Sequence, residues 1–214
     1  MDQEKSLRER IITHAGPMFF EQGFSRITTE ELSRQLGISK KTLYREFDSK
    51  EDIVRAVVRN RLALAGEELS LIFDDDSKSI LERLGCQMKV ASRVLQSLSK
   101  PFLSDLSRYV PDLWEEIQEF RRRRVFDRLE GMFRTGQSEG LINPRVNPKL
   151  LRMIIITIAD NLLVPGTMAE NDISPQEAIE HVGLMIGRGV LTETGRSKVI
   201  ESGIIDAKGE QNDG

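Results

Sequence analysis

The stretch that decides the fold runs from Thr28 to Phe47 and reads TTEELSRQLGISKKTLYREF. Two hydroxyl residues, Thr28 and Ser39, occupy positions suited to helix N-caps, where a side-chain oxygen accepts a free backbone N–H of the first turn. Thr28 is followed three residues later by Glu31, as in a capping box. Only Gly37-Ile38 separates the two segments. The stretch therefore predicts two short helices, starting near residues 29 and 40, joined as a helix-turn-helix pair.

The second of these helices has two different faces. At about 100° per residue, Leu43 and Phe47 fall on one side, while Lys41, Thr42 and Arg45 fall on the other. An isolated basic helix face is most often simply solvated. On the second helix of a short-turn pair, however, long cationic side chains can reach base edges in a major groove. This position favours a DNA-binding role.

The charge of the chain is divided unevenly along its length. The 214 residues carry a formal net charge of −3, with 31 basic and 34 acidic residues. Residues 1–65 hold 12 of the basic and 10 of the acidic residues, so this part is slightly basic and the remainder is acidic. Any contact with nucleic acid must therefore come from a local N-terminal patch.

The apolar spacing is helical almost throughout, and the predicted fold class is all-α. Ser49 and Asp52 predict a fourth helix starting near residue 50, which ends at the charged break 74–79. We expect a helix-turn-helix DNA-binding domain over 1–50, a connecting helix over 51–73 and a further helical domain over 74–194. The tail, 195–214, is polar and glycine-containing, and we expect it to be disordered.

Several classes of protein are disfavoured. The only cysteine, Cys86, has no internal disulfide partner, and His14 and His181 lack metal-ligand spacing. We find no nucleophile elbow or phosphate loop, so we expect neither an enzyme nor a cofactor. The charged N-terminus is unlike a signal peptide, and the longest apolar run is too short to cross a bilayer. We expect a cytoplasmic protein with no membrane contact.

The sequence resembles the tetracycline-repressor (TetR) family of bacterial transcriptional regulators between about Ile11 and Val58. The resemblance rests on FFEQGF at 19–24, Thr28-Thr29, LGIS at 36–39, Thr42-Leu43-Tyr44, Phe47 and Ser49-Lys50-Glu51. It implies that Lys40, Lys41, Thr42 and Arg45 approach base edges, with Tyr44, Thr29 and Lys50 at phosphates. Together with Ser39 at the helix start, these are the candidate DNA-binding residues.

Beyond residue 65 the resemblance implies a helical domain for ligand binding and dimerisation. Large or flexible apolar side chains suggest a ligand pocket, although plain core packing is the alternative. Two polar groups on an apolar helix, Asp160 and Asn161, need partners; they could orient a ligand, bond across a dimer or meet an arginine, and we favour a satisfied structural role. The candidate ligand residues are Met88, Leu95, Trp114, Ile117, Phe120, Asp160 and Asn161. Apolar stripes on the last two long helices suggest a two-fold interface, or else the monomer core. The candidate interface residues are Leu150, Ile154, Ile158, Leu162, Ile179, Val182, Ile186 and Val190.

Two functions follow. The first is a homodimeric repressor that binds a near-palindromic double-stranded DNA operator and is released by a small-molecule effector. The second is an architectural DNA-binding dimer without an effector.

Overall fold

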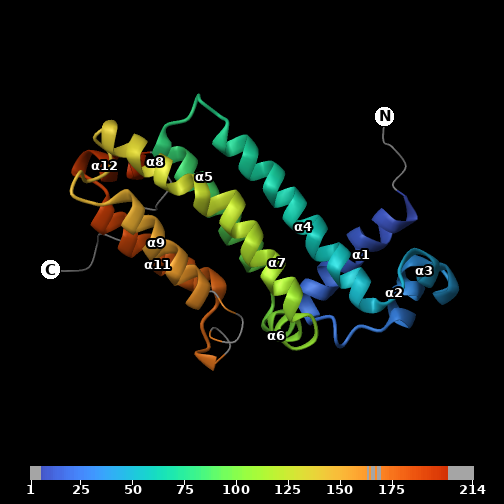
Figure 1. Ribbon diagram of the computed structural model, residues 1–214. Coiled ribbons are helices and arrows are strands. Elements are labelled where there is room, and N and C mark those ends of the chain that lie inside the picture. The colour runs from blue at the N-terminus through green and yellow to red at the C-terminus, as the bar shows by residue number, and fades with distance from the viewer. Residues whose placement is uncertain (1–5, 163, 165–166, 168–169, 202–214) are drawn as a thin grey trace.

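The computed structural model describes residues 6–162, 164, 167 and 170–201. Over these residues the regular structure is helical, with one isolated antiparallel bridge between Ile142 and Leu191, so the all-α prediction is confirmed. The N-terminal helices lie at one end of an elongated molecule, and α8 and α12 lie at the other (Figure 1). The elements are α1 (Leu7–Gln22), α2 (Thr29–Leu36), α3 (Lys40–Glu46), α4 (Lys50–Phe73), α5 (Ile80–Gln96), α6 (Lys100–Tyr109), α7 (Pro111–Arg121), the π-helix η1 (Arg122–Phe126), α8 (Asp127–Ser138), α9 (Pro148–Asn161), α11 (Pro175–Val190) and α12 (Glu193–Glu201).

The caps read from the sequence set the helix starts. The Thr28 hydroxyl accepts the Glu31 N–H, and the Ser39 hydroxyl accepts the Thr42 N–H. Ser49 caps α4 in the same way, by accepting the N–H of Asp52. The predicted starts near residues 29, 40 and 50 are therefore confirmed.

The N-terminal core is shared between the first four helices and two later ones. Leu32, Leu43 and Phe47 are buried in it as predicted, and Leu36 and Ile38 are partly buried against it. Side chains of α6 and α7 complete the same core, namely Phe102, Leu103, Leu106 and Leu113. The hydrophobic contacts of the helix-turn-helix region thus continue into the part of the chain expected to be regulatory.

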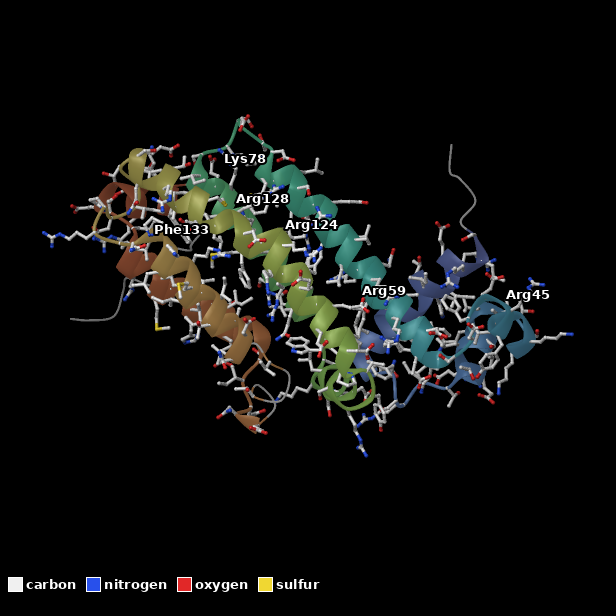
Figure 2. All side chains as sticks on the ribbon, in the orientation of Figure 1. Arg45, Arg59, Lys78, Arg124, Arg128 and Phe133 are labelled. Carbon is white, nitrogen blue, oxygen red and sulfur yellow. The ribbon has the colours of Figure 1, made fainter. Side chains whose placement is uncertain are left out.

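A second core fills the opposite end of the molecule. Phe126, Leu129 and Phe133 pack there with Leu151 and Ala159 of α9. Figure 2 labels Phe133 at this end of the molecule. The structure differs from the expected disordered tail, because helix α12 extends to Glu201 and buries Val199. Residues 202–214 of that expected tail lie outside the described residues. No helix in the described part of the chain has the length and apolar character needed to span a bilayer.

Candidate functional site

Helix α3 presents its cationic side chains to solvent. Leu43 is fully buried, whereas Lys41 and Arg45 are exposed, and the Arg45 side chain retains 74% of its accessible surface. Arg45 lies at the end of the molecule farthest from α9 and α11 (Figure 2). The two-faced helix predicted from the sequence is therefore present, with its basic side free to meet another molecule.

The turn before α3 has a defined geometry. Gly37 adopts φ 67° and ψ 30°, a left-handed conformation that favours glycine, and Ile38 donates its N–H to the Ser33 carbonyl. The hydroxyls of Ser39 and Thr42 lie 2.8 Å apart at the start of α3. These contacts fix the direction of α3 relative to α2.

Lys40 is not a free cation in this structure. Its ammonium pairs with the Glu30 carboxylate of α2. The hydrogen bond to Glu30 raises the pKa of Lys40, and the bond to Lys40 lowers the pKa of Glu30. Both side chains are exposed, and exposed pairs stabilise a fold only weakly. Lys40 can therefore exchange Glu30 for another anion at small cost.

Thr29 and Tyr44 form one unit across the two helices. Thr29 is buried, and its hydroxyl lies 3.2 Å from the hydroxyl of Tyr44. Tyr44 itself is 45% exposed. The tyrosine therefore reaches the surface, while the threonine orients it from below.

Lys50 makes contacts that the sequence did not reveal. Its ammonium donates hydrogen bonds to the carbonyls of Phe24, at 3.0 Å, and Ile27, at 3.3 Å. A cation in the first turn of a helix opposes the helix dipole, and this unfavourable placement was the one available signal that Lys50 has other partners. Two of its three donors hold the α1–α2 loop, which leaves one for a phosphate.

The seven candidate ligand residues do not surround one cavity. Phe120 lines a groove between α4 and α7, whereas Trp114 and Ile117 pack against the N-terminal core. Asn161 donates its side-chain N–H to the Thr157 carbonyl of its own helix. Met88 is partly exposed on α5, with its methyl group close to Gly183 of α11. Leu95 is partly buried near the end of α5.

Asp160 meets Arg121, one of the partners considered for it from the sequence. The Arg121 Nη2 lies 3.7 Å from the Asp160 carboxylate, and its guanidinium lies 5.2 Å from the centre of the Trp114 ring. The Nε and Nη2 atoms of Arg121 are buried without a hydrogen-bond acceptor among the described residues. Burial lowers the pKa of Arg121, and Asp160 partly opposes this shift. Arg121 is the first residue of a run of four arginines, 121–124, and its side chain retains only 19% of its accessible surface.

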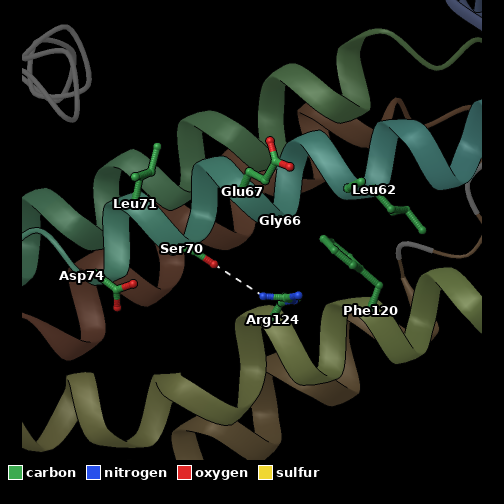
Figure 3. Close-up of a pocket in the computed structure, with 9 residues that line it drawn as sticks. Leu62, Gly66, Glu67, Ser70, Leu71, Asp74, Phe120 and Arg124 are labelled. Atoms are coloured by element: carbon green, nitrogen blue, oxygen red, sulfur yellow. Dashed lines mark hydrogen bonds between the residues drawn. The ribbon is translucent and has the colours of Figure 1, made fainter. Parts of the chain in front are cut away.

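The groove between α4 and α7 has a volume of about 550 Å³. Figure 3 shows this groove in close-up. Arg124 and Ser70 also line it and were not predicted. Their approach depends on how α4 and η1 pack together, which no short-range sequence pattern encodes.

The candidate interface residues divide into two groups. Leu150 and Ile154 of α9 are exposed, together with Met153 and the α11 side chains Leu184 and Met185. The other members are more covered: Ile158, Leu162, Ile179, Val182 and Ile186 are partly buried, and Val190 is buried. Val190 therefore packs in the second core of its own chain. An exposed apolar surface nevertheless remains over α9 and α11.

Comparison with known proteins agrees with this geometry. Residues 11–57 match the family described as bacterial regulatory proteins, tetR family. The fold and this match make the chain similar to DNA-binding transcriptional regulators of the TetR family, and the predicted resemblance is confirmed.

Individual relatives support the same class. The chain is 23% identical to the HTH-type transcriptional regulator YvaF of Bacillus subtilis over 86% of this chain and 96% of that protein. It is 35% identical to IcaR, the negative transcriptional regulator of the biofilm operon icaADBC in Staphylococcus epidermidis, over 25% of this chain and 29% of IcaR. A Saccharomonospora viridis transcriptional regulator in complex with choline shares the fold, with a TM-score of 0.66, 19% identity and coverage of 87% of this chain and 98% of that one.

Proposed function

We propose that this chain is a homodimeric repressor that binds a near-palindromic operator and is released by a small-molecule effector. The observation that carries the proposal is the exposed basic face of α3, opposite a fully buried Leu43. A rigidly packed helix of this kind can enter a major groove, where lysine and arginine donate to guanine acceptors. The relative IcaR is a negative transcriptional regulator.

The contacts of the candidate DNA-binding residues give them different roles. Lys41 and Arg45 are the base readers, together with Thr42, and Lys40 joins them by leaving Glu30. Tyr44 contacts a phosphate through its exposed hydroxyl. Thr29, Ser39 and Lys50 act mainly by holding the helices in place, because their polar atoms already have partners within the fold.

Dimerisation supplies the second recognition helix. The exposed Leu150, Ile154 and Met185 give α9 and α11 an apolar surface that a second copy would cover. A two-fold dimer reads two half-sites when its recognition helices are roughly 34 Å apart. An effector changes affinity only if it prefers a conformation with another separation of those helices.

The test is fluorescence anisotropy with duplex DNA from upstream of the chain's own gene and a random duplex of equal length. Arg45→Gln should lower the preference for the specific duplex, because a good base contact contributes about 1–3 kcal/mol of discrimination. Lys198→Gln, at an exposed position on α12, removes a positive charge away from α3 and should change nothing. Equal affinity of the unaltered chain for both duplexes would exclude sequence-specific binding.

An architectural dimer without an effector shares the same DNA interface. The groove between α4 and α7 favours the effector-responsive function, since a pure scaffold needs no such depression.

A further inference from the structure

The groove between α4 and α7 has an apolar wall, and one residue of α4 in that wall, Gly66, has no side chain. Leu62 and Gly66 contribute from α4, and Phe120 contributes from α7. A Cβ atom at Gly66 would lie 3.2 Å from Cε2 of Phe120, so the absence of a side chain there lets the ring approach α4 closely. The volume of about 550 Å³ lies within the range of small-molecule sites.

One guanidinium enters this groove without a carboxylate partner. Arg124 lies four residues after Phe120, and both side chains line the groove. Figure 3 shows Arg124 and Ser70 pointing toward each other, but their separation of 3.5 Å makes a weak hydrogen bond. No described carboxylate comes within ion-pair distance of Arg124. Two carboxylates also line the groove, but Glu67 points away from Arg124 (Figure 3) and Asp74 lies 3.7 Å from Arg128.

The other arginines of the run are already paired. Arg122 and Arg123 both bind Glu119, and Arg121 faces Asp160. Arg124 is therefore the member of the run whose charge remains available to a ligand.

The backbone that carries Arg124 is itself unusual. Residues Arg122–Phe126 form a π-helix between α7 and α8. Such segments are rare and often occur at functional sites, because the wider turn changes which side chains share a face.

We propose that this groove is the effector site and that it takes a small amphipathic organic acid. The oxyanion of the ligand binds the planar guanidinium of Arg124, and its apolar body lies against Leu62 and Phe120. The inference rests on the proposed effector-responsive function, and α4 connects the groove directly to the end of α3.

The test uses the full chain and two fluorescent probes with the same ring skeleton. One is 8-anilinonaphthalene-1-sulfonate, which is anionic, and the other is N-phenyl-1-naphthylamine, which is neutral. Each is titrated into the unaltered chain, Arg124→Gln and Arg123→Gln. The control removes the same charge from the same π-helix, at an exposed residue that does not line the groove.

We expect Arg124→Gln to raise the Kd of the sulfonate about tenfold, because a charge-assisted hydrogen bond is lost. Arg123→Gln should leave that Kd within about twofold, and neither variant should change the Kd of the neutral probe by more than this. Equal effects of the two variants, or equal effects on the two probes, would overturn the organic-acid site.

The DNA titration described above separates this inference from the proposed function. If the chain binds no DNA while the Arg124-dependent affinity for the sulfonate is present, the regulator proposal fails and the ligand site stands. If specific DNA binding is present while Arg124→Gln changes the Kd of neither probe, the proposed ligand site is wrong and the regulator proposal stands.

Discussion

Replacing Gly23 by alanine should damage the junction between the DNA-binding helices and α6. Gly23 ends α1 with φ 80° and ψ 147°, close to a region of backbone space that only glycine enters readily. An added Cβ would lie 2.8 Å from the Asp105 carboxylate and 3.0 Å from Pro101. Asp105 is buried and accepts the N–H of Ser25 at 2.7 Å, so its displacement also breaks a hydrogen bond between α6 and the α1–α2 loop.

The magnitude follows from these two losses. The backbone conformation costs a non-glycine residue about 1–3 kcal/mol. A hydrogen bond to a charged group contributes about 1.5–3 kcal/mol. We therefore expect Gly23→Ala to lower the free energy of unfolding by about 2.5–6 kcal/mol, a large share of the roughly 5–15 kcal/mol that holds a typical domain together.

Gly37→Ala is the matched control. Gly37 also has a positive φ, of 67°, but no atom lies within 4 Å of the position that its Cβ would take. Its replacement should cost only the left-handed conformation, about 1–2 kcal/mol. Urea unfolding followed by circular dichroism, at equal protomer concentration, measures both. Equal losses in the two variants would refute the argument that contacts with α6 make Gly23 necessary.

Three further outcomes are expected from the ion pairs and hydrogen bonds. Arg121→Met should leave the thermal midpoint unchanged or raise it, whereas Asp160→Asn should lower it. Only the second change leaves a buried guanidinium without its carboxylate. A lower midpoint for Arg121→Met than for Asp160→Asn would contradict this account. Arg55 lowers the pKa of Asp112 below its usual 3.8. That pair therefore stabilises the fold at pH values above the unfolded-state pKa of Asp112 and loses its effect as pH falls through the folded-state pKa. Asp112→Asn should accordingly flatten the dependence of the urea midpoint on pH below about 4. An unchanged slope would count against a role of this pair in stability. Lys50→Gln should lower both the stability, by about 1–3 kcal/mol, and the affinity for all DNA sequences alike; a loss of affinity for the specific duplex alone, in the anisotropy assay, would assign it to base recognition.

The features that the sequence predicted correctly depend on residues that lie close together along the chain. The starts of α2, α3 and α4 follow from Thr28, Ser39 and Ser49, since a cap acts within one helical turn. The burial of Leu43 opposite Lys41 follows from helical periodicity in the same way.

What the sequence could not supply depends on contacts between distant segments. Lys50 reaches the carbonyl of Phe24, 26 residues earlier, and Arg124 meets Ser70 across 54 residues. Helix α12 forms where a disordered tail was expected because Gly195 lies tightly against the Leu141 backbone and Val199 enters a core cluster with α5 and α8. Such packing is visible only once the helices are placed together.

The core shared by α1–α4 with α6 and α7 bears on how such a protein can be re-engineered. Phe24 stacks edge-on against Phe102 and Tyr109, and Phe20 does the same against Phe102. A chimera that grafts residues 1–50 onto a foreign effector module would strip these rings of their partners. Exchanging only the exposed side chains of α3 would instead leave these aromatic contacts, which join α1 and the α1–α2 loop to α6, intact.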